Sequence, residues 1–176
     1  MKILTFAASN SKKSINKTLA AYAASQIDNA EVELVDINDY EMPLFSVDRE
    51  QELGSPQEAK NFFQKIGAAD AIIISFAEHN GSYTAAYKNL FDWVSRIETK
   101  VFQQKPVVYL STSPGPGGAS NVLASAVQSA PHFGADLKSS LSVPSFYDNF
   151  DGDNNRITNS DIQIDLERAL GTLISA

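Results

Sequence analysis

Three short stretches of the chain carry residue types that could hold an anionic ligand. Residues 8–16 combine hydroxyls, side-chain amides and two lysines just before a helical pattern. Residues 77–83 contain an Asn-Gly pair after a run of isoleucines, and residues 111–118 contain two prolines and three glycines. Hydroxyls, backbone N–H groups and a helix N-terminus together bind phosphate, and glycine lets backbone approach a ligand closely. The three stretches therefore indicate that this chain binds a ligand.

The first stretch is the candidate phosphate site. Its candidate donors are hydroxyls, an amide and backbone N–H groups at the start of a helix: Ser9, Ser11, Ser14, Ile15 and Asn16. A simpler alternative is that Ser14 and Asn16 only cap the helix and that the lysines are solvated. Its position after the first strand favours phosphate binding. The stretch is neither a Walker A sequence nor Gly-x-Gly-x-x-Gly, which disfavours a P-loop NTPase and a conventional dinucleotide-binding enzyme.

The second stretch offers side chains for acid-base or metal chemistry. Glu78 is a candidate general base, and His79 is a candidate proton donor or metal ligand. The chain has two histidines, His79 and His132, and neither lies in a His-x-x-x-His or acidic cluster. A metal site is therefore disfavoured. Asn80 and Gly81 are a tight-turn signal, and a turn is compatible with a role in binding.

The third stretch follows the fourth β pattern of the chain. Its candidate ligand contacts are Ser111, Pro114, Gly115 and Gly117. Glycine-rich loops are common connectors, so this stretch alone indicates little. Its position matters more, because ligands of open α/β sheets bind beyond the carboxyl ends of the strands. We expect all three loops to converge on one crevice there.

Five short β patterns alternate with amphipathic helical patterns and must position these loops. The β patterns cover residues 3–7, 32–37, 71–76, 107–111 and 137–143. The alternation predicts an α/β fold with a doubly wound, five-stranded parallel sheet, helices on both faces and right-handed crossovers. We expect the flavodoxin-like strand order 2-1-3-4-5 and a single domain over residues 1–176.

Capping signals predict where two of the helices begin. The tetrapeptide at 55–58 predicts a capping box with proline at the first helical position, and Ser160 with Gln163 predicts the start of the last helix. Residues 48–52 are acidic and polar, which is typical of a solvated loop. Residues 151–155 lack the glutamate of an EF-hand loop, so we expect a solvated turn there.

Composition limits the possible partners and the compartment. The 176 residues carry a formal net charge of −7, which disfavours nonspecific binding to nucleic acid or to an anionic membrane. The chain has no cysteine, which excludes disulfides and cysteine-based catalysis. No stretch approaches the roughly 20 apolar residues of a membrane span or has a signal-peptide core. We expect a cytoplasmic protein.

The second stretch and the helix after it resemble a known family motif. Residues 77–82 read Ala-Glu-His-Asn-Gly-Ser and are followed by Lys-Asn at 88–89 and Asp-Trp at 92–93. This is similar to the flavin loop of the NADPH-dependent FMN reductase family, which reads Pro-Glu-Tyr-Asn-Gly-Ser, then Leu-Lys-Asn and Asp-Trp. Ala77 stands where that family usually has proline, and His79 where it usually has tyrosine. The resemblance implies that four residues meet the flavin ring largely through backbone groups: Glu78, His79, Asn80 and Gly81.

Two other loops extend the resemblance over most of the chain. In the first loop Ser9, Ser14 and Asn16 match the family pattern. Ala8 stands where the family has glycine, and Ser11 where it has arginine, so a neighbouring lysine would have to supply the positive charge. The third loop resembles the family's Gly-Gly loop on the other side of the flavin.

The segment at 42–45, Met-Pro-Leu-Phe, is similar to one that walls the cleft and the subunit contact in the same family. The alternative is that this segment packs on the domain's own core. The resemblance implies a homodimer or homotetramer, with Phe45, Phe91 and Trp93 as candidate contact residues.

The resemblance implies an enzyme with FMN as cofactor and NADPH or NADH as electron donor. Hydride would pass to N5 of the flavin, and a small acceptor would then take the electrons: free flavin, a quinone, an azo dye or a metal oxyanion. We expect no indispensable catalytic side chain, because the cofactor carries the chemistry. Two alternatives remain: a non-enzymatic electron carrier like flavodoxin, and a flavin-free interaction or sensor domain.

Overall fold

A central sheet of five parallel strands organises the chain. The computed structural model describes residues 1–174. The strand order is β2-β1-β3-β6-β7, so the predicted order 2-1-3-4-5 is confirmed. The predicted β patterns match these strands to within two residues at each end: β1 (Lys2–Ala8), β2 (Glu31–Val35), β3 (Ala71–Phe76), β6 (Pro106–Thr112) and β7 (Asp136–Val143).

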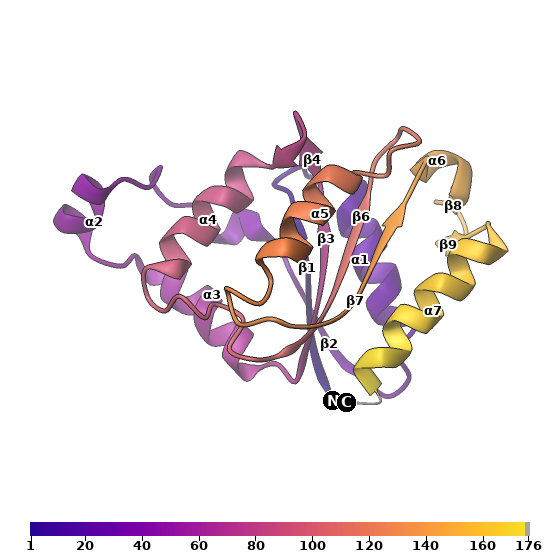
Figure 1. Ribbon diagram of the computed structural model, residues 1–176, viewed down its shortest axis with the longest axis horizontal. Helices are drawn as coiled ribbons and strands as arrows, with labels where there is room; N and C mark the ends of the chain where they lie inside the picture. The colour runs from indigo at the N-terminus through magenta and orange to yellow at the C-terminus, as the bar shows by residue number, and fades with distance from the viewer. Residues whose placement is uncertain (175–176) are drawn as a thin grey trace.

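Helices cover both faces of the sheet, as a doubly wound fold requires. Figure 1 shows α1 (Ile15–Ser25) and α7 (Ser160–Ile174) together on one side of the sheet. The other face is covered by α3 (Gln57–Ala68), α4 (Ala85–Ser95) and α5 (Ser120–Ser129). The predicted α/β fold class is therefore confirmed.

The central strands are buried on both faces because successive side chains point in opposite directions. Ile72 and Ile74 of β3 pack in the core under α3, α4 and α5, whereas Ile73 packs in the core under α1 and α7. All six residues of β3 are buried. A continuous apolar run is the pattern of a central parallel strand, and it places the loop after β3 in the middle of the sheet's carboxyl edge.

Several short elements decorate the sheet. A hairpin of β4 (Glu78–His79) and β5 (Ser82–Tyr83) follows β3, and a second hairpin joins β8 (Phe150–Asp151) to β9 (Arg156–Ile157). A 3-10 helix η1 (Ile37–Tyr40) follows β2, and a one-turn helix α6 (Phe146–Asn149) follows β7. Residues 152–155 form a turn, as expected.

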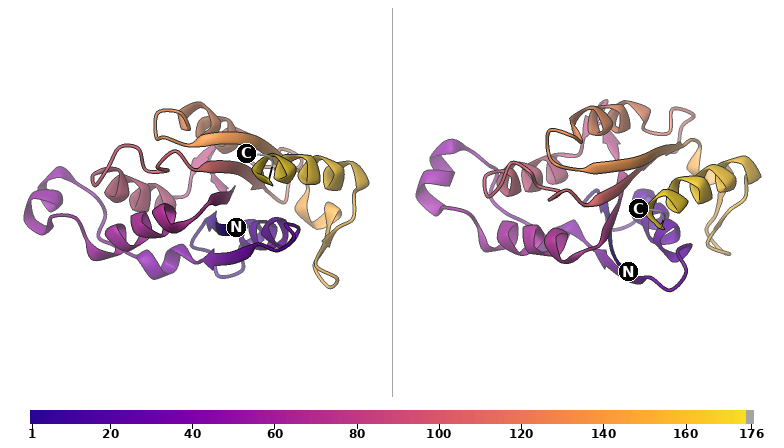
Figure 2. Two further views of the ribbon diagram at one scale, coloured as in Figure 1. Left: turned by 90° about the horizontal axis from the view of Figure 1, so that it is seen from below. Right: turned by 60° about the horizontal axis from the view of Figure 1, so that its bottom comes forward.

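The expectation of a solvated loop at residues 48–52 is wrong. These residues belong to helix α2 (Val47–Leu53), and none of the residues of this helix is buried. Ser46 caps the helix by accepting a hydrogen bond from the N–H of Arg49 at 3.2 Å, and Gly54 ends it at φ +66°. Two local caps can thus form a helix that periodicity does not reveal. Figures 1 and 2 show α2 on an arm that projects from the body of the molecule.

The two predicted capping boxes are also wrong in detail. Helix α3 begins at Gln57 after Pro56, and no side chain caps it. Helix α7 is capped by Asn159, whose Oδ1 accepts from the N–H groups of Asp161 and Ile162 at 3.0 and 3.2 Å. Asparagine at an N-cap position serves as well as serine. None of the helices in residues 1–174 has the length and apolarity to cross a bilayer.

Candidate functional site

The three loops singled out by the sequence converge at the carboxyl edge of the sheet. A pocket of about 230 Å³ opens there, beyond the ends of β1, β3 and β6. The hairpin β4–β5 and the loop between β6 and α5 lie at the upper end of the sheet in Figure 1. Eight of the residues expected to bind a cofactor line this pocket: Ser9, Ser11, Ser14, Ile15, Asn16, Glu78, His79 and Pro114.

The other five expected residues do not line the pocket. Asn80 and Gly81 form the tip of the β4–β5 hairpin, and Gly115 and Gly117 lie in the loop between β6 and α5. Ser111 is fully buried at the end of β6, where its Oγ donates to the carbonyl of Gly118 at 2.7 Å. These residues belong to the loops and the strand end around the pocket but do not line it.

Sequence reasoning missed four lining residues, whereas Lys13 is one of the two lysines expected to replace the family's arginine. Ala77, Thr112 and Ser113 directly follow or end the strands, so their positions alone could have indicated them. Tyr147 of α6 lies far along the chain and is 70% exposed at the pocket rim. Nothing in its local sequence connects it to the other loops, since the pairing of β6 with β7 brings it there.

The first loop ends in a capped helix whose first N–H groups have no partner within residues 1–174. Ser14 is the N-cap of α1, as predicted, and its Oγ accepts from the N–H of Lys17 at 3.2 Å. The N–H groups of Ile15 and Asn16 make no hydrogen bond to another described residue. Ser9 Oγ accepts from the N–H of Ser11 at 3.2 Å. The hydroxyl hydrogens and the free N–H groups are donors at the positive end of a helix, which suits an anion.

The side chain of Asn16 holds the loops together. It is 3% exposed. Its Nδ2 donates to the carbonyl of Thr112 at 3.0 Å, and its Oδ1 accepts from Ser75 Oγ at 2.7 Å and from the N–H of Thr112 at 3.1 Å. One amide thus joins the start of α1 to the ends of β3 and β6. Because these contacts hold the side chain inside the fold, we expect its backbone N–H to be the group that serves a ligand.

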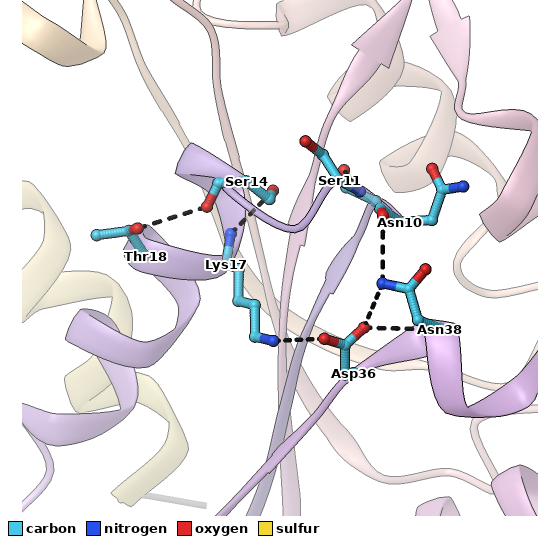
Figure 3. A network of polar contacts seen from close by, with 8 residues as sticks. Asn10, Ser11, Ser14, Lys17, Thr18, Asp36 and Asn38 are labelled. Carbon is cyan, nitrogen blue, oxygen red and sulfur yellow. Dashed lines mark hydrogen bonds and ion pairs between the residues drawn. The ribbon is translucent and has the colours of Figure 1, made fainter.

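A network of polar side chains fixes the outer side of the first loop (Figure 3). Lys17 Nζ contacts Asp36 Oδ2 at 2.5 Å, and Asn38 Nδ2 donates to Asp36 Oδ1 at 2.8 Å and to the carbonyl of Asn10 at 3.2 Å. The hydrogen bond from Lys17 lowers the pKa of the Asp36 carboxyl below its usual value. Lys17 is therefore committed to Asp36. Among the residues that line the pocket, Lys13 is the only lysine or arginine, and no ion pair engages it in residues 1–174.

The second loop is a β-hairpin with a two-residue turn. His79 pairs with Ser82 across the turn, and Asn80 and Gly81 both have positive φ, at 53° and 75°. This is the geometry of the type I′ turn that an Asn-Gly pair favours, so the predicted tight turn is confirmed. At the end of the hairpin Thr84 Oγ1 donates to the carbonyl of Ala8 at 3.0 Å, which anchors the hairpin to the end of β1.

The carboxylate of Glu78 caps a neighbouring helix. Its Oε2 accepts from the N–H of Val122 at 2.9 Å, and its Oε1 accepts from Asn121 Nδ2 at 3.3 Å. The N-cap residue of α5 is Ala119, which offers no side-chain acceptor. Glu78 therefore supplies from the second loop the acceptor that α5 lacks, and its negative charge is favourable at a helix N-terminus. This contact joins the second loop to the third.

The third loop is held by a glycine and by hydrogen bonds to the segment after β7. Gly118 has φ +57°, and a Cβ there would lie 2.3 Å from Ser142 Oγ and 3.1 Å from the nitrogen of Pro144. Its carbonyl accepts from Ser111 Oγ and Ser142 Oγ at 2.7 and 2.9 Å. A Cβ added at Gly115 or at Gly117 would have no atom within 4 Å beyond the neighbouring residues of the chain. The loop is thus rigid at its base and open at its tip.

The segment at 42–45 packs largely on the chain's own α4. Trp93 is fully buried, its Nε1 donates to the carbonyl of Pro43 at 2.7 Å, and its ring contacts that of Phe45 at 5.1 Å between centroids. Asn89 Oδ1 accepts from the N–H of Phe45 at 2.8 Å. The expectation that Trp93 lies at a subunit contact is therefore wrong, because its partners belong to the same chain. In contrast, Leu44 is 69% exposed.

The described part of the chain holds no group of three or more histidine, aspartate or glutamate side chains that could bind a metal ion. Glu78 and His79 lie at the pocket, and His132 is exposed on the turn after α5. The site is instead a set of hydroxyls and backbone N–H groups with one lysine at its edge. This arrangement can hold a phosphate-bearing ligand.

Comparison with known proteins points to one family. The sequence pattern of the NADPH-dependent FMN reductase family matches residues 1–147. The quinone reductase of Escherichia coli K12 is 32% identical over 125 residues, which is 68% of this chain and 64% of that protein. An NAD(P)H-dependent FMN reductase of Pseudomonas aeruginosa is 37% identical over 84 residues, 48% of this chain and 44% of that protein. The chain thus spans less than two thirds of the length of these relatives.

Solved structures confirm the fold. The flavoenzyme NAD(P)H:(acceptor) oxidoreductase FerB of Paracoccus denitrificans superposes with a TM-score of 0.79 at 21% identity. That comparison covers 99% of this chain and 97% of the other. The azoreductase AzrA superposes with a TM-score of 0.63 at 16% identity and covers both chains completely.

Proposed function

Because the chain belongs to the NADPH-dependent FMN reductase family, we propose that it is an FMN-dependent NAD(P)H oxidoreductase. The proposed electron donor is NADPH or NADH, and the proposed acceptor is a quinone or a free flavin. Relatives named quinone reductase and FMN reductase support both parts of the proposal. The observation that carries it is the pocket in which three loops meet at the carboxyl edge of the sheet.

The first loop fits the phosphate of FMN. The unpartnered N–H groups of Ile15 and Asn16, with the hydroxyls of Ser9 and Ser14, converge on the pocket at the N-terminus of α1. Lys13 supplies the positive charge for which the family uses arginine. A chain with a net charge of −7 needs such local donors to hold an anion.

The second and third loops fit the two sides of a planar ring. The turn at Asn80 and Gly81 ends the hairpin whose Glu78 and His79 line the pocket, and a Cβ at Gly81 would have no atom within 4 Å. The third loop lines the pocket through Pro114, and Gly115 beside it has the same open space. Bound FMN supplies hydride transfer at its N5. The loops' role is to orient the ring and to hydrogen-bond it through backbone groups.

Side chains at the site hold the loops rather than move protons. The carboxylate of Glu78 accepts from the N–H of Val122 at the start of α5, which supports a bracing role in place of a general-base role. His79 is exposed at the rim, where it can shape access to the ring. His79→Ala should therefore change turnover modestly, and complete loss of turnover with FMN still bound would identify a proton donor.

We also propose that the chain forms a homo-oligomer through the arm that carries α2. The arm projects from the body (Figure 2) and exposes three large apolar side chains, Leu44, Val47 and Leu53, at 69%, 60% and 57%. Apolar side chains that gather on a projecting element favour a protein contact. Sedimentation equilibrium should give more than one chain per particle, and Val47→Asp with Leu53→Asp should weaken the assembly.

An anaerobic visible spectrum of the purified, FMN-reconstituted protein tests the proposed activity. Addition of NADPH or NADH should bleach the flavin, and a quinone added next should restore its colour. Bound flavin that neither nucleotide reduces would favour an electron carrier. Failure to bind FMN at all would contradict the proposal for the three loops.

A further inference from the structure

A second concavity lies between α4 and α5, and Tyr83 at the end of the β4–β5 hairpin lines it. Its volume is about 210 Å³. Aromatic rings from five separate parts of the fold form its walls: Phe76, Tyr83, Tyr87, Phe91, Tyr109 and Phe133. Phe91 and Phe133 meet edge to face at 4.6 Å between centroids, and Phe76 and Tyr109 at 5.1 Å. Such walls are complementary to a flat aromatic molecule.

Two tyrosine hydroxyls in this cavity have no hydrogen-bond partner among residues 1–174. Tyr87 and Tyr109 are 5% and 1% exposed. Every side-chain polar atom that is completely buried in the described part of the chain has a partner. The hydroxyls of Tyr87 and Tyr109 have no partner and so cannot be completely buried. The small exposed area of each residue therefore includes its hydroxyl, which faces the open volume of the cavity. An unpartnered hydroxyl in an apolar wall is unfavourable, and a ligand oxygen would relieve that cost.

The floor of the cavity is uncharged at neutral pH. Burial raises the pKa of Tyr87 and of Tyr109 far above the usual value for tyrosine. Both phenols thus remain protonated and can donate. The charges at the cavity belong to Lys88 and Asp92, which pair with each other at 2.6 Å and are partly exposed. The cavity therefore favours a neutral ligand with an acceptor oxygen.

The volume limits the size of the ligand. An apolar cavity of about 150 Å³ is large enough to bind benzene. The 210 Å³ here is enough for one ring with a small substituent.

We propose that this cavity is a second ligand site, which binds a single-ring aromatic molecule whose oxygen accepts hydrogen bonds from Tyr87 and Tyr109. It is distinct from the proposed FMN pocket, because no residue lines both. Glu78 and His79 line that pocket, whereas Tyr83 lines this cavity. The proposal does not depend on the redox activity of the protein.

Fluorine NMR of 4-fluorophenol with the purified protein, with and without FMN, tests the proposal. A saturable change in the 19F shift should appear in both conditions. The double variant Tyr87→Phe, Tyr109→Phe keeps both rings and removes both donors, so its affinity should fall about tenfold. Tyr22→Phe is the matched control, because that hydroxyl donates to Gln163 at 2.7 Å in the other core and its loss should leave binding unchanged.

A second variant tests the route of entry. Ser125 is exposed at the mouth of the cavity on α5, so Ser125→Phe should block entry without disturbing the core. Binding that neither variant weakens would place the phenol outside this cavity, and binding that FMN abolishes would place it at the carboxyl edge. Either result would overturn the proposal. The absence of a saturable change in the unmodified protein would also overturn the proposal. That is the result expected if a second copy of the chain fills the cavity.

Discussion

The pocket at the carboxyl edge and the aromatic cavity differ in how they are built. The pocket is formed largely by three loops, each a run of neighbouring residues. The aromatic cavity is formed by residues of one face of α4 and one face of α5, together with scattered residues of β3, β5, β6 and the segments before β6 and after α5. A site made of contiguous residues leaves a pattern in the sequence, and a site assembled by tertiary packing does not.

The two sites also use side chains differently. At the pocket most side chains brace the loops: Asn16 ties α1 to two strands, and Glu78 caps α5. The groups left for a ligand there are largely backbone N–H groups. In the cavity the backbone is already paired in strands and helices, so side chains such as Tyr87 and Tyr109 face the space. Substitutions at the pocket should thus affect stability as well as binding.

Gly118→Ala should have the largest effect on this comparison. The added Cβ would lie 3.1 and 3.2 Å from backbone atoms of Pro144, which cannot move away as a side chain could, and φ is +57°. We expect a loss of about 3–4 kcal/mol in the free energy of unfolding, together with weaker FMN binding. Chemical denaturation and an FMN titration measure both. Gly117→Ala is the control, since its Cβ meets no atom within 4 Å and should cost less than about 1 kcal/mol.

Asn16→Ala should follow in size. It leaves the N–H and the carbonyl of Thr112 and the hydroxyl of Ser75 without partners in a buried place. We expect a loss of about 2–3 kcal/mol in the free energy of unfolding even without flavin. The exposed Asn10 of the same loop is the control, and Asn10→Ala should change stability by less than about 0.5 kcal/mol. Equal stabilities for the two variants would mean that Asn16 does not brace the loops.

Glu78→Gln separates a bracing role from a catalytic one. Glutamine keeps an acceptor for the N–H of Val122 but removes the charge at the start of α5. The free energy of unfolding should fall by about 0.5–1 kcal/mol. Turnover with NADPH should stay within a few-fold of the unmodified protein. A loss of about 100-fold or more with FMN still bound would assign Glu78 to acid-base catalysis instead.

Asp36→Asn should have the smallest effect, and that effect should depend on pH. The pKa of Asp36 is lowered in the folded chain by the hydrogen bond from Lys17. The ion pair therefore stabilises the fold above the unfolded-state pKa, and this contribution is lost as pH falls through the lowered folded-state pKa. Because both side chains are about one third exposed, we expect at most about 1 kcal/mol at pH 7. Denaturation at about pH 3 and below should give converging stabilities for variant and parent.

Sequence patterns were sufficient for the sheet and for most of the pocket. The isoleucine run of β3, bounded by turn signals, and the Asn-Gly pair after it are local signals for a buried strand and a tight turn, and both are present. Ser14 was predictable as an N-cap for the same reason. Helix α2 was missed because it buries no apolar face; its two caps and the ion pair of Glu50 with Arg96 hold it instead.

The remaining features depend on contacts between distant residues. Tyr147 reaches the pocket only because β7 pairs with β6. Glu78 has the residue type of a general base, and only the position of α5 shows that its carboxylate is a cap. Trp93 has the residue type of an interface aromatic, and only the fold of segment 42–45 shows that its own chain covers it.

A crystal structure of the protein with FMN tests most directly whether the carboxyl-edge pocket is the flavin site. We predict the phosphate at the N-terminus of α1, within hydrogen-bond distance of Ser14 and of the N–H groups of Ile15 and Asn16. The ring should lie between the turn at Asn80 and Gly81 and the loop that contains Pro114. A phosphate bound away from α1, or a ring bound outside the three loops, would contradict the assignment of this pocket.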